Sequence, residues 1–173
     1  MIAGKGAGLP QGRLEHKIQV IRQALALHAG QIPSDRTTSP EGTFEFLRRL
    51  GGLEIAGMTG LFLGAAASGI PVVMDGLISA VAALAAERIA RGCREYMIAS
   101  HSGREPGTAA ALEQLSLRPV IDANLALGEG TGAILLFPLL DMAMSLYRYG
   151  TAFADTGIEA YKRFEDPGSP GRS

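Results

Sequence analysis

The sequence lacks several features that mark common classes of protein. Tryptophan is absent and aromatic residues make up only 6% of the 173 residues, which leaves few platforms for stacking nucleic-acid bases. The formal net charge is -1, so no basic excess indicates a nucleic-acid partner, and we expect none. The single cysteine, Cys93, excludes an internal disulfide framework and fits a reducing, cytoplasmic compartment. The neighbouring Arg91 and Arg94 are compatible with a reactive thiol, but we expect Cys93 to have a structural role.

The sequence pattern indicates no targeting segment and no membrane-spanning segment. The N-terminus, Met1–Gly6, has neither the charged nor the apolar region of a signal peptide. The uncharged run Ile55–Met74 has the length of a membrane span, about 20 residues, and Gly60-x-x-x-Gly64 fits a helix-dimer motif. However, Ser68-Gly-Ile-Pro71 interrupts the run. A small-residue helix followed by a buried strand is therefore favoured, and we expect no membrane partner.

The first third of the chain has a helical pattern. Apolar residues recur at helical spacing from Leu14 to Leu25, with Gly30 as a helix end. Ser39-Pro40-Glu41 provides the N-cap and first-position proline of a second helix, which ends at Gly51-Gly52. A third helix, rich in alanine and glycine, is expected over roughly residues 54–68.

The rest of the chain alternates short apolar strands with helices. The expected strands are residues 70–74, 95–99 and 119–121, and the helices after them run to about residues 91, 116 and 149. This alternation is typical of parallel βαβ units and predicts an α/β fold, a helix-rich, Rossmann-like parallel sheet with flanking helices. The length suits one domain, which we assign to residues 1–165, and residues 166–173 are expected to form a disordered tail.

Side chains capable of chemistry follow the expected strands. Asp75, the cluster His101–Glu105, Asp122 and Glu129 come directly after strands or after a short loop. Because ligands of open α/β sheets bind beyond the carboxyl ends of the strands, we expect these side chains to gather at one edge. The sequence therefore predicts a binding site at that edge.

Two glycine-containing segments have more than one interpretation. Gly4-Lys-Gly-Ala-Gly8 suits a turn whose N–H groups approach an anion, but it lacks the complete phosphate-loop and dinucleotide patterns, and a plain turn is the alternative. Glu129 lies between Gly128 and Gly130, before an apolar helix whose N-terminus favours an ionised carboxylate. Such a group can accept a proton from a substrate N–H or hold a cation. A helix-terminal acid without a partner is the alternative.

The cluster after the second strand fits no hydrolase pattern. His101-Ser-Gly-Arg-Glu105 has neither the serine nucleophile elbow nor metal-ligand spacing, and we expect no metal or cofactor. A loop that hydrogen-bonds an anion or a sugar is favoured, with a surface pair between Arg104 and Glu105 as the alternative. Asp75 begins a helix and suits an N-cap, which can also face a ligand. On its spacing alone, Lys17 is expected in solvent.

In combination, these segments resemble the nicotinate-nucleotide:dimethylbenzimidazole phosphoribosyltransferase family of cobalamin biosynthesis. The matching segments follow the family's order and are Gly4–Gly8, Arg13–Lys17, Leu50–Ala56, Ile70–Gly76, Ala99–Gly107 and Leu127–Ala133. The resemblance implies transfer of phosphoribosyl from nicotinate mononucleotide to 5,6-dimethylbenzimidazole or a related azole, giving α-ribazole 5′-phosphate. A non-catalytic nucleotide- or azole-binding fragment or paralogue that retains the fold is the alternative.

The resemblance also implies roles for particular residues. It makes Glu129 the general base that takes the N–H proton of the azole, and Lys17 the lysine that holds the phosphate. The further substrate-binding residues that it implies are Asp75, His101, Ser102, Gly103, Gly128 and Gly130. The resemblance covers the C-terminal half of the family fold, whose N-terminal half supplies much of the benzimidazole pocket. We therefore expect a homodimer or a complementing N-terminal-half chain.

Overall fold

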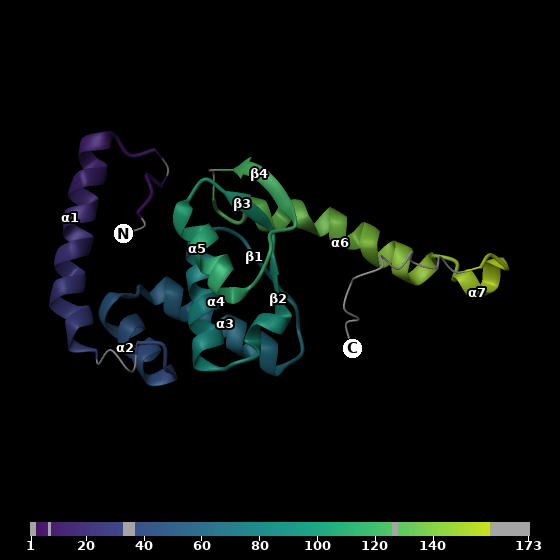
Figure 1. The fold of residues 1–173 in the computed structure, drawn as a ribbon, viewed down its shortest axis with the longest axis horizontal. Helices are drawn as coiled ribbons and strands as arrows, with labels where there is room; N and C mark the ends of the chain where they lie inside the picture. Colours follow the sequence, from purple (N-terminus) through teal and green to yellow (C-terminus); the bar gives the residue numbers. More distant parts are fainter. Residues whose placement is uncertain (1–2, 7, 33–36, 126–127, 160–173) are drawn as a thin grey trace, which may run out of the picture. The chain divides into compact units, whose positions relative to one another are not determined.

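The computed structural model describes residues 3–6, 8–32, 37–125 and 128–159 and confirms the predicted α/β class (Figure 1). The backbone divides into two compact units, Met1–Phe137 and Pro138–Ser173. All the residues of the candidate site that the structure describes lie in the first unit. The tail predicted over residues 166–173 lies outside the described residues.

The three helices predicted in the first third are present. They are α1 (Gln11–His28), α2 (Pro40–Leu50) and α3 (Leu53–Ala67), and a short 3-10 turn, η1 (Ala29–Gln31), follows α1. Ser39 caps α2 as predicted, because its Oγ accepts a hydrogen bond from the Gly42 N–H at 3.1 Å. The uncharged run from residue 55 to 74 divides into a helix and a strand. Across the part of the chain that the structure describes, no helix has the length and hydropathy to cross a membrane.

The first two strands agree with the predictions, and the last two differ from them. β1 (Val72–Met74) and β2 (Met97–Ala99) fall within predicted strands, but β3 (His101–Gly103) lies where a polar loop was expected. The third predicted strand, residues 119–121, is wrong in its bounds, since β4 runs from Ile121 to Leu125 and includes Asp122. Residues of β4 alternate between half-buried and exposed, so this strand has no continuous apolar run to mark it.

All strand pairs in the described residues are parallel, as predicted. β1 pairs with β2 in the register Val72–Met97, and β3 pairs with β4 in a separate two-stranded sheet. Only Ser100 separates β2 from β3. Its N–H donates to the Met74 carbonyl at 3.2 Å and its carbonyl accepts from the Ile121 N–H at 2.9 Å, so the two strand pairs adjoin there.

The core of the first unit lies between the helices and the first strand pair. α4 (Leu77–Ile89) packs against both α3 and α5 (Pro106–Leu115), with a 3-10 turn, η3 (Cys93–Tyr96), after it (Figure 1). Alanines allow this close approach, and those of α4 that are fully buried include Ala82, Ala83 and Ala86. Cys93 is 6% exposed and belongs to the same core, as expected for a structural cysteine.

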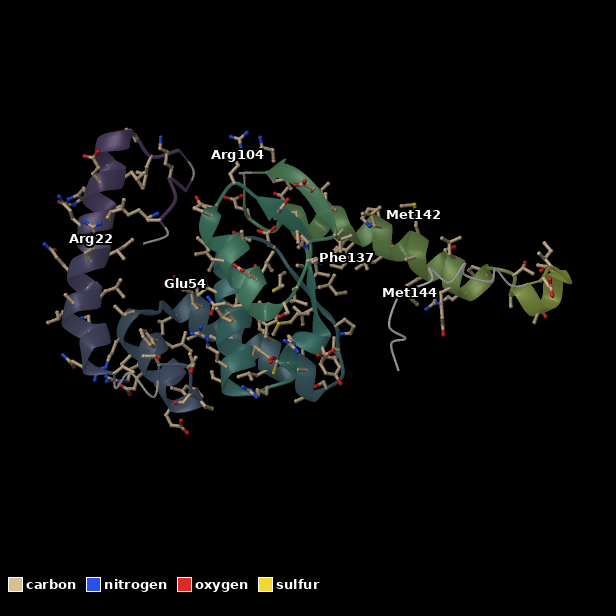
Figure 2. All side chains as sticks on the ribbon, viewed as in Figure 1. Arg22, Glu54, Arg104, Phe137, Met142 and Met144 are labelled. Atoms are coloured by element: carbon tan, nitrogen blue, oxygen red, sulfur yellow. The ribbon has the colours of Figure 1, made fainter. Side chains whose placement is uncertain are left out.

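The last long helix, α6 (Thr131–Tyr149), has the predicted bounds, and α7 (Phe153–Thr156) follows it. Several apolar side chains of α6 are exposed: Phe137 by 51%, Met142 by 55% and Met144 by 47% (Figure 2). Exposed apolar surface of this kind is typical of segments that other protein surfaces cover.

Candidate active site

A cavity of about 700 Å³ lies at the carboxyl ends of β3 and β4. One wall is the glycine turn, which we define as Gly4, Lys5, Gly6 and Gly8. The other walls come from the residues between β3 and α5, beginning at Gly103, and from Leu77, Leu125 and Gly128. Two predicted substrate-binding residues, Gly103 and Gly128, thus line one cavity. Its position at the strand ends matches the edge at which ligands bind in α/β folds.

Asp75 connects the end of β1 to the start of α6. Its Oδ1 accepts hydrogen bonds from Gly132 N–H at 2.9 Å and Ala133 N–H at 3.2 Å, and its Oδ2 accepts one from Gly130 N–H at 3.2 Å. The expectation that Asp75 caps its own helix is therefore wrong, because Gly76 is the N-cap of α4 and the carboxylate caps α6 instead. An anionic group is favourable there because unpaired N–H groups and the helix dipole point at it.

Glu129 lies in a loop with an unusual backbone conformation. Gly128, Glu129 and Gly130 have φ values of 79°, 60° and 80°, and only the two glycines adopt such values without steric cost. The Glu129 side chain is exposed and, among the described residues, accepts no hydrogen bond and forms no ion pair. Its neighbour Gly128 lines the 700 Å³ cavity, whereas Glu129 does not. The carboxylate is thus accessible to solvent, and its neighbour Gly130 is held by Asp75.

His101 is buried against the same helix end. Its side chain is 7% exposed, and its Nδ1 lies 2.9 Å from the Oγ of Ser100, which is fully buried. A Cβ added to Gly132 would overlap the imidazole ring at Nδ1, so only glycine fits beside the ring. His101 therefore packs behind the loop that carries Glu129, and its predicted role in substrate binding stays a prediction.

The Lys17 side chain contacts the backbone of the glycine turn. The Lys17 ammonium donates a hydrogen bond to the Gly4 carbonyl at 3.0 Å, so it is not a solvated lysine without partners. Lys17 lines a second cavity, of about 390 Å³, which shares Gly4, Leu77 and Glu105 with the first. The two cavities are neighbours, but Lys17 does not line the one that contains Gly103 and Gly128.

The polar side chains of the β3 segment are paired across the strands. Ser102 Oγ donates a hydrogen bond to Asp122 Oδ1, and Arg104 Nε donates one to Asn124 Oδ1 at 2.7 Å. Arg104 lies just beyond the end of β3 (Figure 2). The alternative of a surface pair between Arg104 and Glu105 is wrong, because the Glu105 carboxylate accepts from the Gly6 N–H instead.

The structure therefore brings together most of the residues that the sequence places at one edge. Asp75, His101 and the Gly128–Gly130 loop form one cluster around the start of α6. Sequence reasoning missed the part played by Ser100 and by Glu105 as a ligand of the glycine turn. The sequence suggested only a surface pair with Arg104 for Glu105, and no local signal indicates a partner 99 residues away.

Comparison with known proteins gives a consistent result. A family model described as Phosphoribosyltransferase matches residues 1–158. The nicotinate-nucleotide--dimethylbenzimidazole phosphoribosyltransferase of Desulforamulus reducens is 44% identical over 157 residues, which cover 91% of this chain and 42% of that protein. The protein of the same name from Ruminiclostridium cellulolyticum is 42% identical over 164 residues, 95% of this chain and 44% of that protein.

Solved structures show the same likeness. The crystal structure of CobT from Thermus thermophilus matches with a TM-score of 0.76 and 38% identity, covering 90% of this chain and 44% of that chain. The chain thus spans less than half the length of these relatives.

Proposed function

The chain belongs to the phosphoribosyltransferase family, and we propose on that premise that it contributes the general base and part of the pocket for one reaction. In this reaction phosphoribosyl passes from nicotinate mononucleotide to 5,6-dimethylbenzimidazole or a related azole, giving α-ribazole 5′-phosphate in cobalamin lower-ligand synthesis. The names of the relatives support the two substrates.

Glu129 is the proposed base. One ring nitrogen of the azole attacks the anomeric carbon of the nucleotide with inversion, and nicotinate leaves with the electron pair of the broken C–N bond. As the new C–N bond forms, the Glu129 carboxylate takes the proton from the other ring nitrogen, so no positive charge remains on the product ring. An exposed carboxylate next to Gly128, which lines the cavity, suits this step.

The observation that carries this proposal is the backbone of the Gly128-Glu129-Gly130 loop. A non-glycine residue at φ 60° costs about 1 kcal/mol relative to the usual helical or extended regions. The Asp75 carboxylate holds this loop at Gly130, and the buried His101 ring packs against Gly132, two residues further along the chain. Strain that is held by several contacts beside a cavity is typical of a functional site.

We place the phosphate of the nucleotide at the start of α5. The first turn of this helix lines the 700 Å³ cavity together with Gly103 and Arg104, and the positive end of the helix dipole with a guanidinium favours an anion. Lys17, in the neighbouring cavity, is the proposed second cation for the phosphate. Ser102 is expected beside the ribose-phosphate moiety.

The acceptor pocket is proposed to need further protein. The chain spans 42–44% of the relatives' length, and exposed apolar side chains such as Met142 and Met144 offer surface for a partner. We propose a second copy of the chain, or a polypeptide equivalent to the rest of the relatives, as that partner, in the cytoplasm.

The test is nicotinate release from nicotinate mononucleotide in the presence of dimethylbenzimidazole. It is measured for the chain alone and after addition of the remaining part of the Desulforamulus reducens relative. We expect little or no turnover alone, and turnover in the mixture that Glu129→Gln lowers by about a hundredfold or more. Gln preserves the size of the side chain and the strained backbone, so the loss reports the proton acceptor. Glu113→Gln, on the exposed side of α5, is the matched control, and equal loss in both variants would refute the assignment.

A second candidate is a nucleotide- or azole-binding module without catalysis. The observation that favours it is that the Glu129 side chain is exposed and does not line the cavity. Calorimetry separates the two: binding of nicotinate mononucleotide without nicotinate release, in every mixture tried, would support the module.

A further inference from the structure

Glu105 occupies the N-cap position of α5 but does not cap that helix with its side chain. Its Oε1 instead accepts a hydrogen bond from the Gly6 N–H at 2.6 Å, across 99 residues of sequence. Its other carboxylate oxygen fills the space beside Gly4, where an added Cβ would overlap Oε2. Gly6 thus binds the Glu105 carboxylate through its N–H group, and Gly4 leaves room for the carboxylate because it has no side chain.

Among the described residues, the other hydrogen bonds of the glycine turn are local, such as the Leu9 N–H bond to the Lys5 carbonyl at 3.0 Å. Gly6 and Gly8 have φ values of 56° and 108°, and a glycine-rich segment loses more conformational entropy on ordering than other residues do. The Lys17 bond to the Gly4 carbonyl spans only 13 residues and comes from the adjoining helix. The Glu105 bond is the contact that connects the turn to the β3–α5 segment, on the other wall of the same cavity.

We propose that Glu105 is a positioning residue for the candidate site. Its carboxylate occupies the anion position of the glycine turn, so the turn serves as a fixed wall of the pocket and not as a phosphate loop. The hydrogen bond between an ionised acceptor and a backbone N–H is the stronger kind, which suits this role. The proposed effect of Glu105 on substrate binding, which is the functional part, rests on the proposed binding of nicotinate mononucleotide. The geometric part, that Glu105 holds the glycine turn in place, does not.

Amide exchange in the free protein tests the geometric part. The rate at residues 4–9 is measured by hydrogen–deuterium exchange and mass spectrometry for Glu105→Ala, Glu105→Gln, Gly4→Ala and the double variant. We expect about tenfold faster exchange in Glu105→Ala, since a hydrogen bond to a charged group is lost, and a smaller change in Glu105→Gln, which keeps an acceptor. Glu113→Ala, an exposed acid on α5, should leave the rate unchanged.

Gly4→Ala provides an independent perturbation from the other side of the contact. The new methyl group displaces the flexible end of Glu105, so this variant should increase exchange as Glu105→Ala does. In the double variant the carboxylate is already absent, and the two effects should not add. Unchanged exchange in Glu105→Ala, or additive effects in the double variant, would overturn the proposal.

Calorimetry tests the functional part with nicotinate mononucleotide and, separately, inorganic phosphate. We expect Glu105→Ala to weaken nicotinate mononucleotide binding about tenfold and to have the same thermal midpoint as Glu113→Ala. Glu105→Gln should retain most of the affinity for the nucleotide. Tighter phosphate binding by Glu105→Ala would instead show that the carboxylate blocks a phosphate loop, and would overturn the proposal. If the unmodified protein does not bind the nucleotide, the proposed function fails, and amide exchange still decides the role of Glu105.

Discussion

Replacing Asp75 with alanine should destabilise the first unit by removing the cap of α6. Three backbone N–H groups, those of Gly130, Gly132 and Ala133, lie 2.9–3.2 Å from its two carboxylate oxygens. A lost N-cap costs about 0.5–2 kcal/mol, and hydrogen bonds to a charged group contribute about 1.5–3 kcal/mol. Because the three bonds share one carboxylate, they do not add, and we expect Asp75→Ala to lower the free energy of unfolding by about 2–3 kcal/mol.

The size of the effect should depend on which oxygen remains. Asp75→Asn keeps one acceptor for Gly132 and Ala133 but turns an NH₂ group toward the Gly130 N–H, so we expect a loss of about 1–2 kcal/mol. Urea unfolding followed by circular dichroism measures both variants, and a domain of this size should lose about 2–4 °C of thermal midpoint per kcal/mol. Asp141→Ala, an exposed aspartate on α6, is the matched control and should change stability by less than about 0.5 kcal/mol. If Asp75→Ala behaved like this control, the capping argument would be refuted.

Two further predictions concern groups with shifted pKa values. Side-chain hydrogen bonds from Arg48, and then from Arg49, lower the pKa of Glu45 from 4.5 to about 2. A lowered folded-state pKa gives stability above the unfolded pKa that is lost as pH falls through the folded value, so Glu45→Gln should reduce the thermal midpoint at about pH 6 but not near pH 2. A difference that persists near pH 2 would contradict this. Burial, and then the charge of Glu87, raise the pKa of the Cys93 thiol, so iodoacetamide at about pH 8 should alkylate it much more slowly than glutathione. Equal rates would be evidence against a buried thiol.

Local signals in the sequence predicted the helices better than the strands. α2 begins and ends where Ser39-Pro40 and Gly51 indicate, and α6 begins at Thr131 as its apolar run indicates. These signals act within one turn of helix, so a single sequence contains them. β3 and β4 were mispredicted because their residues are polar or alternate in burial, and their pairing depends on backbone contacts between segments 20 residues apart.

The site was predicted as a region more accurately than as a set of contacts. The rule that ligands bind beyond the strand ends placed Asp75, His101 and Glu129 near one another. Asp75 does bind Gly130 beside Glu129, and His101 packs against Gly132 at the start of α6. The rule could not give the partners of each group. Asp75 was expected to cap the helix that follows it and in fact caps one that begins 56 residues later, because the capping bond depends on tertiary structure.

Both glycine-containing segments, Gly4–Gly8 and Gly128–Gly130, donate an N–H to a carboxylate that the protein itself supplies. Asp75 binds the N–H groups at the start of α6, and Glu105 binds that of Gly6 in the glycine turn. Either carboxylate would repel a phosphate at the same N–H groups, so we expect the phosphate of the proposed nucleotide substrate elsewhere in the pocket. The first turn of α5, beside Arg104, is a helix N-terminus that lines the cavity and whose N-cap side chain makes no capping bond. The start of α4 is another, since Leu77 lines the same cavity. We favour the first turn of α5 for the phosphate of the proposed substrate, because Arg104 lines the cavity beside it. Glu129, on a strained loop whose Gly130 N–H donates to Asp75, stays the proposed proton acceptor.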